Sequence, residues 1–262
     1  MASTFPASAW ARRSETRLLA QPATVILSGM TDDTSRTTAS AKPPPFFTAP
    51  PLVLLMALLL IALYAAYFFA PYPDQESVKY DFALAPERFW APAGSPKVYP
   101  DVLSGLTTLV STALLHGDWV HVLFNSLMLL SFGAPVARTL GKDVRASVLW
   151  MIIFLGSVVA GSALYLALTD AGSPYAVGAP GGTSGLIAAA FLLDPYGMKR
   201  KLWSREFLTV TGVVAALNAV LTFMGPQLLG IGIAWEAHVG GYITGAILMA
   251  VLPVKGFRPP ES

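Results

Sequence analysis

Three histidines, one asparagine and one serine of this chain could act together on a carbonyl carbon. They are His116, His121 and Asn125 in the segment LLHGDWVHVLFN, Ser184 in GGTSG, and His238 in WEAHVGG. A serine hydroxyl becomes nucleophilic when a neighbouring base takes its proton, and fixed hydrogen-bond donors stabilise the oxyanion that forms. These residue types therefore allow acyl transfer by a serine nucleophile. Thiol chemistry is excluded because the sequence contains no cysteine.

The spacing of these residues suggests a role for each. Asn125 follows His121 by four residues, so both lie on one face of a helix, whereas His116 lies five residues before His121 and off that face. We expect Ser184 in the first turn of a short helix, where backbone N–H groups and the helix dipole favour negative charge. His238 is the candidate base, and its own span offers no carboxylate to orient it. The pattern predicts a Ser184–His238 dyad, with His121, Asn125 and the Ser184 N–H as oxyanion donors.

The composition indicates that membrane helices position these residues. Of the 262 residues, 54% are hydrophobic and 12% are charged, and the mean hydropathy is +0.58. An ordinary soluble domain has about 25% charged residues, which help to cover its surface. A net charge of +2 gives no basic face for nucleic acid, and the absence of cysteine excludes a disulfide scaffold. We therefore expect an all-α integral membrane protein and not a soluble enzyme.

Six apolar segments separate the clusters of charge, and a helical span needs about 20 apolar residues. The fourth segment is unusually short, because the preceding stretch AGSPYAVGAP is too rich in Gly and Pro to be helical. The predicted spans are residues 51–70, 119–137, 146–168, 181–193, 207–224 and 237–252.

These spans define a membrane domain, residues 46–255, between two tails. Residues 1–45 are rich in Ser, Thr, Ala and Pro and are predicted to form a disordered cytoplasmic tail. Residues 256–262 are predicted to form a short cytoplasmic tail. Both Met1 and Met30 could start translation.

The positive residues predict the orientation of the domain, because cytoplasmic loops are enriched in Lys and Arg. Three of the seventeen Lys and Arg lie in the long first loop, and the other fourteen lie on the opposite side, in the tails and the second–third and fourth–fifth loops. We therefore expect both termini in the cytoplasm, in a bacterial cell (inner) membrane. Ser184 then lies about 15 to 22 Å from the cytoplasmic charges that follow its helix, within a hydrocarbon core of about 30 Å. The candidate residues should lie just below the extracytoplasmic surface.

Small residues predict how the helices bring the site together. Gly241 and Gly245 form a GxxxG motif beyond His238, and small residues let helix backbones approach closely in membranes. Gly185 faces this motif from the short fourth helix. We expect the contact to bring Ser184 within reach of His238.

Other polar residues have structural interpretations. Asn218, in the middle of the fifth span, is expected to form an interhelical hydrogen bond. The basic run 199–201 is interpreted as a topology determinant beside anionic lipid. Trp235 and Glu236 are interpreted as anchors at the membrane interface.

Three motifs together resemble those of the rhomboid family of intramembrane serine proteases. They are His121-x3-Asn125 with His116 upstream, GxSG around Ser184, and His238-x2-Gly241-x3-Gly245. They occur in the second, fourth and sixth predicted spans, and the resemblance covers residues 50–255. Many family members carry a Trp-Arg pair at the positions of Thr107 and Thr108, and some place a tyrosine at the position of Ala188.

The resemblance implies a six-helix rhomboid-type bundle in which Ser184 is the nucleophile and His238 is the base. His121 and Asn125 would lie at the oxyanion hole, and His116 would be structural. The substrates would be transmembrane proteins cleaved near the extracytoplasmic face, with the fifth span as a lateral gate. No metal, other cofactor or nucleic acid is implied.

Two other functions are open to a membrane protein of this kind. A catalytically weak rhomboid-like pseudoprotease would bind membrane-protein clients, but it predicts loss of Ser184 or His238, and both are present. A transporter or metal carrier would use the three histidines, but His116 and His121 lie about 140° apart on an ideal helix. A serine endopeptidase in the membrane is therefore the main prediction.

Overall fold

The computed structural model describes residues 49–92, 94–229 and 232–254, without the side chains of residues 226–229. The predicted tails, residues 1–45 and 256–262, lie outside these ranges. Over the described ranges the chain is helical, with two isolated β-bridges and no strand. The predicted all-α fold class is therefore confirmed for this part of the chain.

Four helical segments of the described chain are long and apolar enough to cross a membrane. They are α1 (Pro51–Phe69), the run Trp119–Leu140, α7 (Val144–Leu168) and the part Arg205–Gly225 of α9 (Arg205–Leu229). At the predicted fourth and sixth spans, α8 (Pro180–Phe191) has 12 residues and α10 (Trp235–Val251) has 17. Both are shorter than the 20 or so residues of a full span. The count of six spans therefore stays a prediction.

Three helices begin two residues before the predicted spans. Helices α7, α9 and α10 each carry a charged residue within their first turn, namely Arg145, Glu206 and Glu236. A prediction based on apolar residues stops at such charges, whereas the helical backbone continues through them. Only the helix boundaries change as a result.

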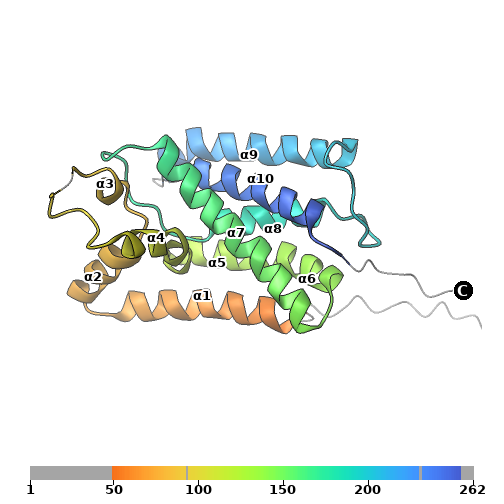
Figure 1. The fold of residues 1–262 in the computed structure, drawn as a ribbon, viewed down its shortest axis with the longest axis horizontal. Coiled ribbons are helices and arrows are strands. Elements are labelled where there is room, and N and C mark those ends of the chain that lie inside the picture. Colours follow the sequence, from red (N-terminus) through yellow and green to blue (C-terminus); the bar gives the residue numbers. More distant parts are fainter. Residues whose placement is uncertain (1–48, 93, 230–231, 255–262) are drawn as a thin grey trace, which may run out of the picture. The chain divides into compact units, whose positions relative to one another are not determined.

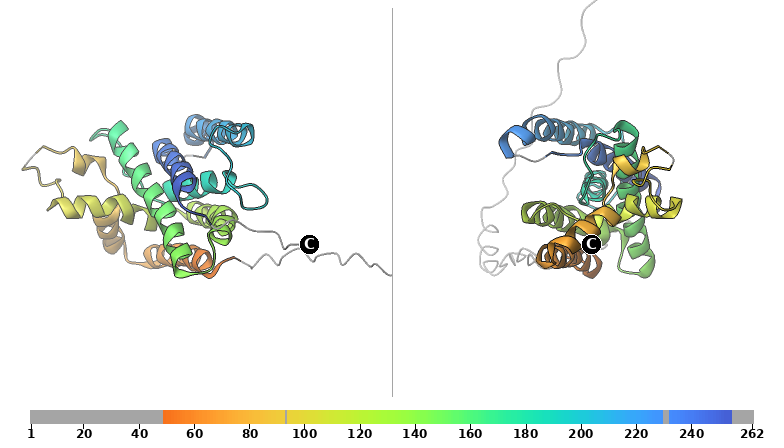
Figure 2. Two further views of the ribbon diagram at one scale, coloured as in Figure 1. Left: turned by 45° about the vertical axis from the view of Figure 1, so that its right-hand side comes forward. Right: turned by 90° about the vertical axis from the view of Figure 1, so that its left-hand side faces the viewer.

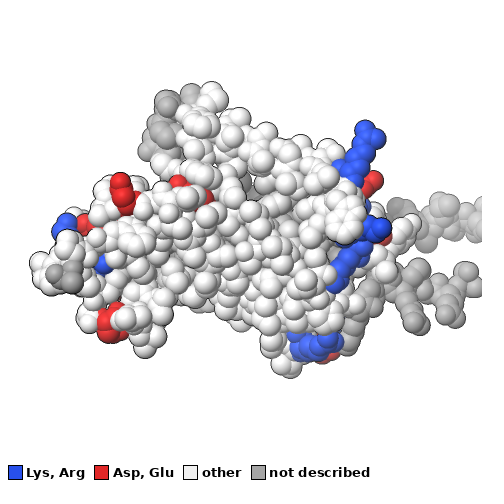
Figure 3. Space-filling model, turned by 45° about the horizontal axis from the view of Figure 1, so that its top comes forward, with Lys and Arg blue, Asp and Glu red and all other residues white. Residues whose placement is uncertain are grey.

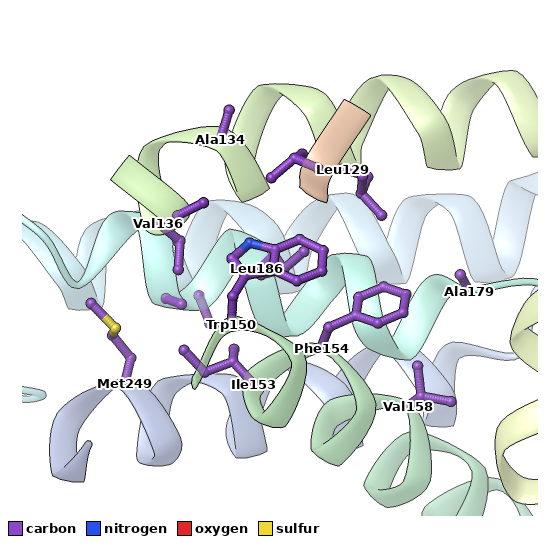
Figure 4. Close-up of a cluster of buried hydrophobic side chains, with 14 of the residues drawn as sticks. Leu129, Ala134, Val136, Trp150, Ile153, Phe154, Val158, Ala179, Leu186 and Met249 are labelled. Atoms are coloured by element: carbon purple, nitrogen blue, oxygen red, sulfur yellow. The ribbon is translucent and has the colours of Figure 1, made fainter. Parts of the chain in front are cut away.

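The second predicted span is built from three pieces. It consists of α5 (Trp119–Met128), the π-helical turn η2 (Leu129–Gly133) and α6 (Ala134–Leu140). Pro135, near the start of α6, has no N–H to donate and favours the wider turn before it. The Gly133 carbonyl accepts a hydrogen bond from Trp150 Nε1 at 3.0 Å. Trp150 and Leu186 lie together in the buried core between these helices (Figure 4).

Helix α8 lies in the middle of the bundle. In the right-hand view of Figure 2 the other long helices surround it, and in Figure 1 it lies between α5 and α10. Eight of its twelve residues are buried. Helices α1 and α9 lie at opposite edges of the bundle, and α9 is the least buried of the four candidate spans. A central helix that is covered by protein does not need the length of a lipid-exposed span.

The two ends of the bundle differ in structure and charge. The first loop folds into α2 (Tyr72–Phe82), α3 (Pro86–Phe89), α4 (Val102–Ser111) and the 3₁₀ turn η1 (Thr112–Leu114) at one end (Figure 1). Lys and Arg gather at the opposite end, and a wide, mostly uncharged band separates the two ends on the face drawn in Figure 3. This distribution is what a bilayer requires.

Two residues of the basic run 199–201 contact the ends of helices. Lys199 Nζ donates to the carbonyl of Ala250 at 2.9 Å and to that of Leu252, at the end of α10. Arg200 Nη1 donates to the carbonyls of Phe191 and Leu193, at the end of α8. The last carbonyls of a helix have no partner within it, so these side chains cap both helices. The interpretation as topology determinants missed this capping role.

Candidate active site

Ser184 lies near the start of the buried helix α8. The helix has Pro180 at its first position, and the N–H of Thr183 already donates to the carbonyl of Ala179 at 2.9 Å. Ser184 therefore opens the second turn, not the first turn as expected from the sequence. Its side chain is buried, with 5% of the residue exposed. The backbone N–H groups left free by their position in the helix are those of Gly181 and Gly182.

Helices α8 and α10 touch through glycine backbones on both sides of Ser184. A Cβ added to Gly241 would overlap the backbone of Gly181, and a Cβ added to Gly245 would overlap the backbone of Gly185. The two glycines of the GxxxG motif thus pack against two glycines of α8, one turn apart on each helix. No side chain larger than hydrogen fits between the backbones.

Helix α7 closes the same junction from a third side. A Cβ at Gly161 would lie 2.6 Å from the Ala237 carbonyl oxygen, and a Cβ at Gly240 would lie 2.8 Å from the Ala160 carbonyl oxygen. A Cβ at Gly185 would overlap Oγ of the buried Ser157. The helices that carry Ser184 and His238 are therefore held by backbone contacts with little freedom to shift.

His238 lies in the first turn of α10 and is partly buried. Its imidazole interacts electrostatically with that of His121. Among the hydrogen bonds of the described residues, none joins Ser184 to His238. The structure thus brings together the two helices of the predicted dyad without a hydrogen bond between the two side chains.

Asn125 connects α5 to the helix of Ser184. Its Nδ2 donates to the His121 carbonyl at 3.1 Å, and its Oδ1 lies 3.3 Å from Thr183 Oγ1, whose one hydrogen it shares with two backbone carbonyls of α8 and its N-cap. Asp118 begins α5 by accepting from the His121 N–H at 2.8 Å. The predicted oxyanion residue Asn125 is therefore held against Thr183, the residue before Ser184, which was not among the predicted site residues. Its position between the glycine and the serine of GxSG was the available signal.

The imidazole of His121 packs against the loop that precedes α8. Gly178 has a positive φ of 106°, and a Cβ there would lie 2.5 Å from Cε1 and 2.6 Å from Nε2 of His121. The Gly178 N–H donates to the Thr112 carbonyl at 2.9 Å. Only glycine combines this backbone conformation with this close approach. The loop and α5 together fix where the His121 ring can lie.

His116 lies in the turn before α5 and is buried against His121. The two ring centroids are 5.1 Å apart and the rings meet edge to face. Burial, followed by the proximity of His121, lowers the pKa of His116 to about 3. Within the described part of the chain, neither nitrogen of its ring has a hydrogen-bond partner. His116 is therefore neutral and fills space behind His121.

The remaining polar interpretations have mixed outcomes. Asn218 Nδ2 donates to the Trp235 carbonyl at 3.5 Å, which is the expected interhelical hydrogen bond. Glu236 was expected at the membrane interface but is buried, with 8% exposed. In the part of the chain that the structure describes, no group of three or more His, Asp or Glu is placed to hold a metal ion.

Comparison with known proteins relates this arrangement to a family. The family model described as "Rhomboid domain" matches residues 104–255, more than half of the chain. Two similar proteins come from Arabidopsis thaliana. RHOMBOID-like protein 4 is 33% identical over 148 residues, which are 56% of this chain and 34% of that protein. RHOMBOID-like protein 12, mitochondrial, is 31% identical over 170 residues, which are 58% of this chain and 48% of that protein.

The chain spans between a third and a half of the length of these relatives. The region that matches the family model nevertheless contains every residue of the candidate site, from His116 to His238. The chain belongs to the rhomboid family.

Proposed function

We propose that the protein is an intramembrane serine endopeptidase that cleaves transmembrane helices near the extracytoplasmic face. The observation that carries this proposal is the backbone contact of Gly241 with Gly181 and of Gly245 with Gly185. This contact fixes the helix of Ser184 against the helix of His238. We propose that the serine–histidine hydrogen bond forms when substrate binds, since catalytic hydrogen bonds often tighten only in the substrate complex.

In the proposed reaction, Ser184 Oγ attacks the scissile carbonyl carbon while His238 takes the hydroxyl proton. The tetrahedral intermediate collapses when His238 gives this proton to the leaving amine, and an ester to Ser184 is left. Water then attacks the ester with His238 as the base, which releases the new carboxyl group and restores the serine. Covalent catalysis thus divides peptide hydrolysis into two easier steps.

The oxyanion of this reaction needs donors on the side of α5. His121 and Asn125 are the proposed side-chain donors, and the Ser184 N–H is the proposed backbone donor. The hydrogen bond from Thr183 to Asn125 Oδ1 supports the assignment, because it fixes the amide group. One Nδ2 hydrogen of Asn125 donates to the His121 carbonyl, and the second is the proposed donor to the oxyanion. The Ser184 N–H follows the first helical bond of α8, so its use requires the first turn to loosen when substrate binds.

Substrates are proposed to be transmembrane helices that unwind near small or helix-breaking residues, because a closed helix hides its peptide bonds. Helix α9 is proposed as the lateral gate, following the family resemblance. Its weak burial supports this role. Among the described residues, two side-chain hydrogen bonds join it to α10: one between Thr211 Oγ1 and Tyr242 OH at 2.9 Å, and one from Asn218 to the Trp235 carbonyl. Few interactions would need to break for α9 to move.

The proposed orientation places both termini and the basic loops in the cytoplasm. It rests on the fourteen Lys and Arg on that side, which oppose translocation across the membrane. In a bacterial cell membrane, the candidate site then opens toward the periplasmic side. No metal or other cofactor takes part in the proposed reaction.

The alternative is a catalytically weak rhomboid-like pseudoprotease that binds client helices. The absence of a Ser184–His238 hydrogen bond among the described residues is the observation that favours it. An assay in liposomes distinguishes the protease from the pseudoprotease. The purified protein is incubated with a set of transmembrane substrates that carry a glycine or proline near the outer leaflet. A protease cleaves at least one substrate in a manner abolished by Ser184→Ala. If the wild type and Ser184→Ala bind the substrates equally and no product depends on Ser184, the pseudoprotease is supported.

A further inference from the structure

The first loop contains a buried arginine that the proposed chemistry does not use. Arg88, in α3, is 5% exposed, and its guanidinium carbon lies 4.0 Å from the ring centroid of Tyr80 and 3.9 Å from that of Tyr99. Its Nη1 donates to the Tyr80 carbonyl, and its Nε donates to the Lys97 carbonyl at 3.3 Å. Burying a cation is costly unless it is bonded, so this cation–π and hydrogen-bond cluster must hold the loop firmly.

The cluster fixes the segment that leads from α2 to α3. Arg88 holds the carbonyl of Tyr80, and Tyr99 OH donates to the carbonyl of Ala83 at 3.5 Å. The next residue, Leu84, forms a two-way bridge to the loop before α8. The Leu84 N–H donates to the Ala176 carbonyl at 3.2 Å, and the Ala176 N–H donates back at 2.9 Å.

The bridged loop is the one that covers His121. Thr112 Oγ1 donates to the Ala176 carbonyl at 2.6 Å, and the Gly178 N–H donates to the Thr112 carbonyl. Gly178 then packs against Cε1 and Nε2 of the His121 ring. A continuous series of contacts therefore runs from the Arg88 cluster to a proposed oxyanion donor.

Thr107 and Thr108 stand at the positions of the family's Trp-Arg pair, and their side-chain hydrogen bonds do not connect separate parts of the first loop in the described chain. Among the hydrogen bonds of the described chain, Thr107 Oγ1 donates to Ser104 and Thr108 Oγ1 donates to Gly105, both within α4. These bonds are local to one helix. Arg88 instead joins separate parts of the first loop, through the Tyr80 and Lys97 carbonyls and the Tyr99 ring.

We propose that Arg88 is a positioning residue that acts on His121 through the first loop and Gly178. By holding the segment bridged to Ala176, it keeps the loop before α8 against the imidazole, so that His121 faces the oxyanion in one orientation. The inference rests on the proposed protease function, because the orientation of His121 affects turnover only if an oxyanion forms beside it.

A double-mutant cycle between Arg88 and His121 tests this proposal. Arg88→Met keeps an unbranched apolar stem but removes the charge and the donors. We expect kcat on a transmembrane substrate to fall about tenfold, with KM changed less than about twofold. His121→Ala should retain about a hundredth of the wild-type kcat. In that background, Arg88→Met should lower kcat by less than about twofold, because its effect passes through His121.

Lys97→Met is the matched control. It removes one cation from the same loop but leaves the Lys97 carbonyl in place, and its ion pair with Glu87 is exposed. Exposed pairs contribute little, so kcat should stay within about twofold of wild type. Thermal unfolding of each variant reports the folded fraction, and kcat is expressed per folded molecule. If Arg88→Met does not fold, Arg88→Lys replaces it in the same double-mutant cycle. The single ammonium group of lysine cannot donate to both carbonyls with the geometry of the guanidinium.

Two results would overturn the proposal. One is a wild-type kcat in a folded Arg88 variant, and the other is that Arg88→Met lowers kcat by the same factor in the wild type and in the His121→Ala background. The second result would mean that Arg88 acts on stability or on another part of the site. Full cleavage by Ser184→Ala would instead overturn the proposed function itself. Inactive Ser184→Ala together with additive Arg88 and His121 effects overturns the positioning role alone.

Discussion

Gly245 of α10 lies against the backbone of Gly185 in α8, so closely that a Cβ on Gly245 would overlap the Gly185 carbonyl oxygen and Cα. Gly185 directly follows Ser184, and Gly245 lies two turns beyond His238. The distance between the backbones of the two proposed catalytic helices is therefore set by the absence of side chains at this contact.

Gly245→Ala should separate these helices. Because the new methyl group has no room, we expect a loss of about 1–3 kcal/mol in unfolding free energy and a fall in cleavage of more than tenfold. Gly212→Ala, in exposed α9, is the control, since nothing lies within 4 Å of a Cβ there. Unfolding in mixed micelles and cleavage per folded molecule are the measurements. Equal behaviour of the two variants would show that the contact does not position the site.

Thr183→Val should release Asn125. The hydroxyl that donates to Asn125 Oδ1 is lost while the shape of the side chain is kept, so we expect kcat to fall about tenfold. The unfolding free energy should fall by about 1 kcal/mol. Thr183→Ser keeps the hydroxyl and should retain most of the activity. If Thr183→Val and Thr183→Ser have the same kcat, the hydroxyl does not orient Asn125.

Acid should destabilise the protein through His116. In the unfolded chain its imidazole takes up a proton below a pKa of about 6.5, whereas burial keeps the folded pKa at about 3. The unfolded state thus binds more protons between these values, and stability falls as the pH falls through this window. The slope from His116 rises toward about 1.4 kcal/mol per pH unit as the pH falls below 6.5.

The His116→Phe variant isolates this contribution, because its ring cannot titrate. Unfolding free energies of wild type and variant at pH 7, 6 and 5 give the two slopes. We expect the wild-type slope to be steeper over this range. Equal slopes would mean that His116 titrates alike in the folded and unfolded states.

Lys199→Met should destabilise the carboxyl-terminal end of α10. Lys199 loses its hydrogen bonds to the Ala250 and Leu252 carbonyls at the end of α10, at a cost of about 1 kcal/mol. Lys201→Met is the control, because it removes the same charge from an exposed side chain in the same run. If Lys199 only determined the topology, Lys199→Met and Lys201→Met would have equal unfolding free energies. Unfolding free energies in the same detergent distinguish the two cases.

The sequence predicted helices best where one apolar run lies between two clusters of charge. Helix α1 matches its predicted span to within one residue, because nothing but hydropathy determines it. The start of α8 was missed by one residue even though Pro180 is a common first helical residue. That single residue moved Ser184 from the first turn to the second.

Contacts between distant segments could not be predicted from spacing. Asn125 and Thr183 are 58 residues apart, and no periodicity relates them. Arg88 was counted as one of three positive charges in the first loop, but its burial depends on Tyr80 and Tyr99, which meet only after the loop has folded. Gly178 could be predicted to lie in a loop, whereas its contact with His121 could not.

The proposed Ser184–His238 dyad is tested most directly by the reaction of the purified protein with a fluorophosphonate probe. Its phosphorus should bond to Ser184 Oγ with loss of fluoride, and mass spectrometry should find the adduct on the peptide that contains Ser184. We expect Ser184→Ala to abolish this labelling and His238→Ala to slow it by more than about a hundredfold, because the base is lost. Equal labelling of the wild type and both variants would contradict the Ser184–His238 dyad.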